Sequence, residues 1–162
     1  MSTDAQWLDL SLEGVDRAAA DRIRAFRLLV VEGARLRGLL DRALAPSGVT
    51  AQQGALLSWI QAQPAPPTYS AVAAGLGMTH QNVKQIAVAL QRKGLLEIRV
   101  DEQDRRARRL FLTRRHHRFW RDRNPGDYAA VQAWMAAWSD DEVRQALQLL
   151  RRLHRHLDGG GD

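Results

Sequence analysis

The hydrophobic pattern of this 162-residue chain changes its period at Gly94, and that change limits the possible folds more than any other feature. A helix is expected to begin after Thr79, because apolar residues there recur at a spacing that places them on one helical face. These residues are Val83, Ile86, Ala87 and Leu90. After Gly94, apolar and polar residues alternate over 95–100, and a second strand is expected over 108–112 after a polar turn. The pattern predicts a helix followed by an antiparallel β-hairpin.

A short helix made mostly of small residues is expected just before this one, over 70–76. Gly77 and Met78 join the two helices and allow a tight crossing, as in a helix-turn-helix. The first turns of the second helix then carry polar side chains outward: His80, Gln81, Asn82, Lys84 and Gln85. Amide side chains placed there can pair with base edges in a major groove, although a solvated polar face is the simpler interpretation of this helix alone.

The positive charge of the chain is concentrated in one segment. The whole sequence has a formal net charge of +6, whereas residues 92–123 alone hold 12 Arg or Lys against 5 Asp or Glu. Four arginines lie at or just beyond the hairpin tip, where they can reach phosphates or a minor groove: Arg105, Arg106, Arg108 and Arg109. An ordinary solvated basic surface is the alternative. Asp101 and Asp104 are expected to pair with arginines and fix the hairpin loop.

Two helices are expected ahead of this region. The first runs over about 15–45, and the second begins after Thr50, whose spacing to Gln53 is that of a capping box, and ends near residue 63. Residues 64–67, with the sequence ProAlaProPro, cannot be helical in their middle and form a rigid connector.

Two further helices are expected after the hairpin. Thr113 is placed to cap the first, which is interrupted or kinked at Asn124-Pro125-Gly126. The last opens at Ser139, which forms a capping-box pair with Glu142. Its apolar stripe is suited to packing on another helix and consists of Val143, Leu147, Leu150, Leu153 and Leu157.

The expected fold is therefore mainly α with a small β-hairpin wing. It combines a winged helix-turn-helix DNA-binding lobe with helices from both ends of the chain, to which the family resemblance described below assigns dimerisation. The expected boundaries are 1–14 for an N-terminal arm, 15–48 for a dimerisation helix, 49–113 for the DNA-binding lobe, 114–157 for C-terminal dimerisation helices and 158–162 for a flexible tail.

Several classes of function are disfavoured. The chain has no cysteine, which excludes disulfides, thiolate metal sites and cysteine nucleophiles. His116 with His117, and His154 with His156, point to different helix faces and are read as solvated polar residues, so we expect neither a metal nor another cofactor. Glycine-rich phosphate loops and nucleophile motifs are absent from the sequence, which argues against an enzyme. No apolar run approaches a membrane span, and we expect a cytoplasmic, nucleoid-associated protein.

The stretch LGMTHQNVKQIAVALQRKGLLE, followed by DEQDRRARRLFLT, resembles the MarR family of winged-helix regulators. The resemblance covers about 15–157, and its most specific part is the acidic-x-x-Asp-Arg-Arg wing followed by LeuThr. Two positions depart from the family pattern: Glu102 stands where a proline is usual, and His116 stands where a glycine is usual.

The resemblance implies a homodimer whose terminal helices interlock and whose paired lobes read a palindromic duplex. By position, His80, Gln81, Asn82, Lys84 and Gln85 would read the groove. Ser70 and Thr79 would lie near phosphates, Arg105 or Arg106 at the wing tip, and Asp104 would brace the wing. Members commonly bind small aromatic ligands in a crevice beside the dimer helices, which here implies Trp59, Phe119 and Trp120, although such residues are more often plain core.

The sequence therefore predicts a sequence-specific DNA-binding transcription regulator, most simply a repressor. It would act as a homodimer on a palindromic operator in double-stranded DNA and be released by a small aromatic effector. The alternative is a winged-helix protein that makes protein–protein contacts or binds nucleic acid without sequence preference and has no effector.

Overall fold

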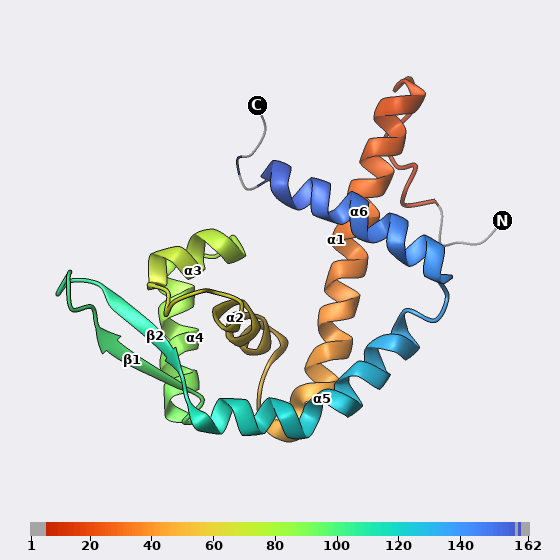
Figure 1. The fold of residues 1–162 in the computed structure, drawn as a ribbon. Helices are drawn as coiled ribbons and strands as arrows, with labels where there is room; N and C mark the ends of the chain where they lie inside the picture. The colour runs from red at the N-terminus through yellow and green to blue at the C-terminus, as the bar shows by residue number, and fades with distance from the viewer. Residues whose placement is uncertain (1–5, 158, 160–162) are drawn as a thin grey trace. The chain divides into compact units, whose positions relative to one another are not determined.

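Figure 1 shows the fold in a computed structural model, which describes residues 6–157 and 159. These residues form helices and a two-stranded antiparallel hairpin, so the expected mainly α class with a β-hairpin wing is confirmed. The chain divides into two units, Met1–Ala51 and Gln52–Asp162. Residues 1–5 of the expected N-terminal arm, and the expected tail 158–162 except for Gly159, lie outside the described residues.

The first unit is built on one long helix, α1 (Arg17–Leu44), which is followed by a short 3-10 helix, η1 (Ala45–Ser47). The guanidinium group of Arg27 donates hydrogen bonds to the carbonyl oxygens of Leu8, at 2.6 Å, and Leu10, at 2.9 Å. One side chain thus satisfies two backbone acceptors in the segment before the helix. This part of the expected arm is held against α1.

The chain then continues through α2 (Ala51–Gln61), α3 (Tyr69–Leu76), α4 (His80–Arg92), β1 (Leu96–Val100), β2 (Arg108–Leu112), α5 (Arg114–Trp134) and α6 (Asp140–Leu157). Fully buried side chains from α2, α3, α4 and both strands form a common core: Leu56, Leu57, Val72, Val83, Ala87, Leu90, Leu96 and Leu110. The expected apolar face of α4 is therefore the buried face, and its burial fixes which side of the helix meets solvent.

The connector before α3 takes part in the sheet. Strands β1 and β2 pair in antiparallel register, with Ile98 opposite Leu110. On the other edge of β2, the Leu110 amide donates to the carbonyl oxygen of Pro67 at 3.0 Å, and Thr68 forms an isolated bridge with Arg109. Proline can accept but not donate a backbone hydrogen bond, so it suits this edge position. The connector, expected only to be rigid, also anchors the wing beside α3.

The expected caps of α5 and α6 are present. Thr113 Oγ1 accepts a hydrogen bond from the His116 amide at 3.1 Å and donates one to the Gly94 carbonyl at 2.7 Å, so it joins the start of α5 to the end of the α4 segment. The Ser139 amide donates to Glu142 Oε2 at 2.8 Å, and the Glu142 amide donates to Ser139 Oγ at 3.4 Å. This reciprocal pair is the capping box that the sequence predicts.

Of the two alternatives expected at Asn124-Pro125-Gly126, an interruption or a kink, the interruption is wrong, because α5 runs from Arg114 to Trp134 with Pro125 inside it. Proline removes one helical hydrogen bond and crowds the preceding turn. Arg123 compensates locally, since its guanidinium group donates to both carboxylate oxygens of Asp127, at 2.8 and 3.3 Å. This i,i+4 pair is largely buried and connects the turns on either side of Pro125.

Helix α6 is amphipathic and carries its apolar stripe on the surface of the single chain. Every residue of the stripe expected from the sequence is at least 36% exposed: Val143, Leu147, Leu150, Leu153 and Leu157. Charged and amide residues occupy its other faces. Across the part of the chain that the structure describes, no helix has the length and apolar character needed to cross a membrane.

Candidate nucleic-acid interface

The turn between α3 and α4 sets the angle at which α4 leaves the core. Gly77 ends α3 in the left-handed conformation, with φ of +60°, and the Met78 amide donates to the Ala73 carbonyl at 2.9 Å. A side chain at Gly77 would be strained in that conformation. Thr79 then caps α4, because its Oγ1 accepts from the Asn82 amide at 3.2 Å. The two expected helices are thus joined by a short, hydrogen-bonded turn.

The face of α4 opposite the core is polar. Four of the five residues expected to read a groove are exposed: His80, Gln81, Lys84 and Gln85. Asn82 differs from the expectation, because it is half-buried rather than exposed. It lies next to the buried Val83, and its backbone amide is engaged by the Thr79 cap.

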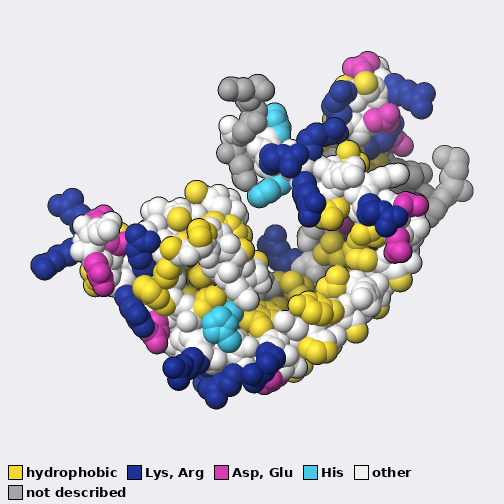
Figure 2. Space-filling model, in the orientation of Figure 1, with side chains coloured by type: hydrophobic (Ala, Val, Ile, Leu, Met, Phe, Trp, Pro, Cys, Tyr) yellow, Lys and Arg dark blue, Asp and Glu magenta, His cyan; other side chains and the backbone are white. Residues whose placement is uncertain are grey.

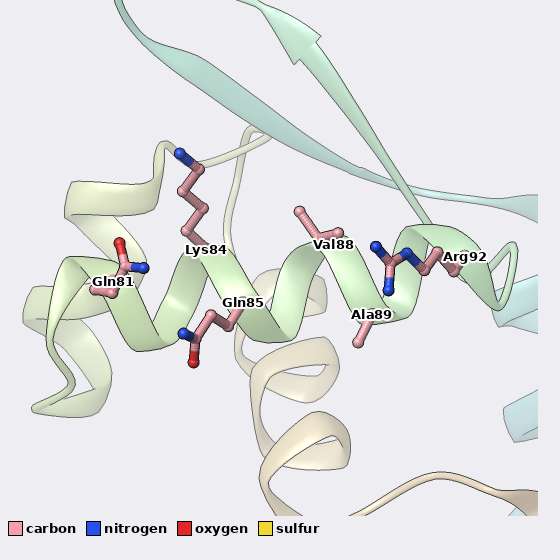
Figure 3. A pocket seen from close by; sticks show the side chains of 6 residues that line it. All are labelled: Gln81, Lys84, Gln85, Val88, Ala89 and Arg92. Carbon is pink, nitrogen blue, oxygen red and sulfur yellow. The ribbon is translucent and has the colours of Figure 1, made fainter.

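A shallow groove of about 340 Å³ runs along the exposed face of α4. We call it the α4 groove, and it is lined by Gln81, Lys84, Gln85, Val88, Ala89 and Arg92. Figure 3 shows Lys84 and Val88 along one edge of the helix, Gln85 and Ala89 along the other, and Gln81 and Arg92 towards its two ends. Two amides and two cations therefore surround an apolar centre.

Asp101 holds the wing turn together. It is 4% exposed, and its Oδ1 accepts from the amides of Gln103, at 2.8 Å, and Asp104, at 3.1 Å. Its Oδ2 pairs with the Arg109 guanidinium group. The two backbone hydrogen bonds, assisted by Arg109, hold the pKa of the Asp101 carboxyl below its usual value. Asp104 makes a local contact, accepting from the Arg106 amide at 2.9 Å.

The wing arginines fall into two groups. Arg109 donates to the Pro66 carbonyl at 2.9 Å, and the half-buried Arg108 donates to the carbonyls of Arg105, at 2.9 Å, and Ala107, at 3.1 Å. The side chains of Arg105 and Arg106 are instead exposed. Figure 2 shows basic side chains projecting at the end of the hairpin. Arg105 and Arg106 are therefore the wing cations best placed to meet an external anion.

Ser70 and Thr79 lie at the starts of α3 and α4, and both are exposed. Backbone amides at a helix start are partly unpaired and attract anions. The two residues thus occupy positions compatible with the phosphate contacts that the resemblance implies.

Trp59, an expected ligand residue, packs closely on α3. A Cβ atom added to Gly75 would lie 2.2 Å from Trp59 Cζ2 and 2.5 Å from Trp59 Cε2. The absence of a side chain at Gly75 therefore lets the indole lie against the helix. This contact gives Trp59 a packing role between α2 and α3.

The other two expected ligand residues, Phe119 and Trp120, lie next to the buried His116 on α5. The Phe119 and Trp120 rings meet edge to face with centroids 5.0 Å apart, and the Trp120 and His116 centroids are 6.4 Å apart. Both ring nitrogens of His116 and Nε1 of Trp120 are buried without a hydrogen-bond partner among the described residues. Burial, assisted by the neighbouring His117, lowers the pKa of His116 to about 4.

The expectation that His116 is solvated is wrong, because its side chain is fully buried. Its spacing to Trp120 is one helical turn, and this shared face was the signal available in the sequence. In the described part of the chain, no group of three or more His, Cys, Asp or Glu side chains is placed to hold a metal ion.

The α3–α4 pair, the hairpin packed beside it and the capped α5 define a winged helix-turn-helix protein. Residues 47–107 match the model of the MarR family. This match covers the helix-turn-helix and the wing turn, and it confirms the family resemblance of that segment.

Among curated proteins, the chain is 33% identical over 89 residues to the transcriptional repressor MprA of Escherichia coli K12. The match covers 55% of this chain and 51% of the relative, so it spans about half the length of the curated relatives it matches.

Solved structures share the fold at lower identity. A MarR-family transcriptional regulator from Rhodococcus sp. RHA1 has a TM-score of 0.72 at 20% identity, covering 87% of this chain and 98% of that one. MepR of S. aureus in complex with DNA has a TM-score of 0.68 at 23% identity, covering 78% and 93%. CouR of Rhodococcus jostii RHA1 bound to p-coumaroyl-CoA also has a TM-score of 0.68, at 21% identity, and the match covers 78% of this chain and 88% of that one.

The contact between Trp59 and Gly75 makes a stability prediction. Gly75→Ala should lower the free energy of unfolding by about 1–3 kcal/mol, because the new methyl group would overlap the indole and force repacking. Gly126→Ala is the matched control, since Gly126 also lies in a helix but has open space around its Cβ position. Gly126→Ala should leave the free energy of unfolding unchanged or raise it by up to about 1 kcal/mol. Urea unfolding measures both, and equal effects would contradict the packing role.

The buried His116 makes a pH prediction. Its folded-state pKa of about 4 lies below the unfolded value of 6.5, so the unfolded chain binds more protons between these pH values. Stability should be fully present above pH 6.5 and fall on acidification towards pH 4, by up to about 1.4 kcal/mol per pH unit. His116→Leu should remove this slope in thermal unfolding, whereas exposed His117→Gln should retain it. A wild-type slope that survives in His116→Leu would assign the effect to other groups.

Proposed function

We propose that this protein is a sequence-specific DNA-binding transcription regulator that acts as a homodimer on a palindromic operator. One observation carries the proposal: the exposed face of α4 presents amides and cations beside a wing whose tip carries two exposed arginines. A helix of this kind fits a major groove, and the adjacent cations suit the phosphates on its rim. The DNA-bound relative MepR has the same fold, which is consistent with this use.

The proposed division of labour follows from side-chain chemistry. Gln81, Gln85 and the half-buried Asn82 can make paired hydrogen bonds to base edges, which differ between base pairs. Arg105 and Arg106 can contact phosphates or a narrow minor groove, which every sequence offers. Sequence recognition would therefore depend mainly on α4, and sequence-independent affinity for DNA would depend mainly on the wing.

We further propose that the bound protein represses transcription. The curated relative that matches this chain is named a transcriptional repressor, and the two are 33% identical over 89 residues. A dimer seated on a palindrome near a promoter can exclude polymerase without any additional activity.

Two substitutions test whether sequence recognition and sequence-independent affinity reside in different residues. Gln85→Ala should weaken binding to a selected operator by about 1–3 kcal/mol and leave random duplex nearly unchanged, because it removes a hydrogen bond to a base. Arg105→Ala should weaken both and reduce the slope of log affinity against log salt by about 1 for each phosphate that it no longer neutralises. Fluorescence anisotropy over a salt series, after selection of bound duplexes from a random pool, measures these effects.

Arg152→Ala is the control for charge, because Arg152 is exposed on α6 away from the leucine stripe. It should leave both affinity and salt slope nearly unchanged. Failure of the wild-type protein to enrich any duplex would reject the proposed function. Equal losses on all sequences for Gln85→Ala and Arg105→Ala would reject the division of labour.

The homodimer rests on apolar surface that the single chain leaves uncovered. The stripe of α6 is exposed along its whole length, and α1 independently exposes Phe26, Leu29, Val30 and Leu36. Apolar surface of this extent costs free energy in water and marks an association site. A nearly heptad leucine stripe is suited to the same stripe in a second copy.

Leu150→Glu should shift the protein towards monomer, because it places a charge in the centre of the α6 stripe. Gln148→Glu adds the same charge away from the stripe and should leave the dimer intact. Sedimentation velocity distinguishes the two states. A wild-type protein that sediments as a monomer at micromolar concentration would remove the dimer from the proposal.

We also propose that a small aromatic effector binds beside Phe119 and Trp120. The support is three buried atoms, Nε1 of Trp120 and both ring nitrogens of His116, none of which has a hydrogen-bond partner among the described residues; the two ring centroids are 6.4 Å apart. Buried polar atoms of this kind are costly unless a water or ligand engages them. A phenolic carboxylate should release bound operator from the wild type, measured by anisotropy. Trp120→Leu should lose this response, while a response that persists would place the effector elsewhere.

A further inference from the structure

Val88 lies at the apolar centre of the α4 groove, among residues that are otherwise suited to polar contacts. It is half-buried, and it lies one helical turn from both Lys84 and Arg92. The core of the protein does not require Val88, because fully buried Val83, Ala87 and Leu90 fill the opposite side of α4. Its isopropyl group instead faces the groove along the edge that it shares with Lys84 (Figure 3).

The neighbours of Val88 restrict what can cover it. Lys84 and Arg92 favour a polyanion, and Gln81 and Gln85 favour a surface rich in donors and acceptors. An apolar protein partner would have to desolvate all four polar groups, which is costly. The floor of a DNA major groove satisfies the amides and cations, and it offers one apolar group of its own, the C5-methyl of thymine.

We propose that Val88 is a specificity-determining residue that packs against the C5-methyl group of one thymine in each half-site. The inference rests on the proposed function and adds to it a base preference made by apolar contact. Gln85, about one turn before Val88, would read a neighbouring base by hydrogen bonding, so the two residues give separable signals.

The test removes the methyl group from the DNA rather than only the side chain from the protein. Duplexes bound by the wild type are selected from a random pool. Each thymine of the resulting half-site is then replaced in turn by deoxyuridine, symmetrically in both half-sites. Affinity is measured for the wild type, Val88→Ala, Val88→Thr and the control Gln85→Ala.

One thymine position should show a loss of about fourfold per half-site on replacement by deoxyuridine, or about fifteenfold for both, which is the value of one buried methyl group each. Val88→Ala should reduce the deoxyuridine penalty most at that position, because its shorter side chain withdraws from the thymine methyl, whereas Val88→Thr keeps one methyl group and should retain part of the penalty. Gln85→Ala should bind both duplexes more weakly but should show the same loss of affinity as the wild type when thymine is replaced by deoxyuridine.

The possible failures have different consequences. If the wild type selects an operator but shows no deoxyuridine penalty, or if both Val88 variants retain every penalty, the role of Val88 is overturned and the proposed function stands. If the wild type selects no duplex, the proposed function fails and the inference fails with it. Circular dichroism and thermal unfolding confirm that the Val88 variants are folded before either conclusion is drawn.

Discussion

The burial of one face of α4 is the constraint on which the rest of the candidate interface depends. Val83, Ala87 and Leu90 are each 0% exposed, so α4 cannot rotate about its axis without bringing polar groups into the core. The opposite face is therefore presented in one fixed orientation. The same apolar contacts that stabilise the fold determine which side chains line the α4 groove.

The wing strands share the core with α4 through buried Leu96 and Leu110, and polar contacts fix the wing turn and join it to the segment before α3. Asp101 ties the turn to itself through two backbone amides and to β2 through Arg109, which also reaches the Pro66 carbonyl. Pro67 and Thr68 continue this connection into the start of α3. A guanidinium group held by a buried carboxylate and a carbonyl is restricted in orientation. The wing and the helix-turn-helix are thus positioned together, while the side chains at the wing tip remain exposed.

Local chemistry explains what the sequence predicted well. Each correctly predicted feature depends on residues that are close together in the sequence. These features are the second strand, the apolar face of α4 and the caps at Thr113 and Ser139. The substitution at Glu102 leaves the wing turn hydrogen-bonded for a related reason. Asp101 bonds to the amides of residues 103 and 104, so the turn does not require a proline at 102.

What the sequence did not reveal depends on contacts between distant segments. The pairing of the connector with β2, and the packing of Trp59 on Gly75, join residues that no local pattern relates. An interruption at Pro125, one of the two expected alternatives, does not occur; the expectation weighed proline alone, without the Arg123–Asp127 pair across it. A basic, histidine-rich run resembles a solvated surface, yet the helical period brings His116 onto the face of Trp120. The side chain is then buried whatever the average polarity of its neighbours, because helical period, not local composition, determines which face of α5 meets the core.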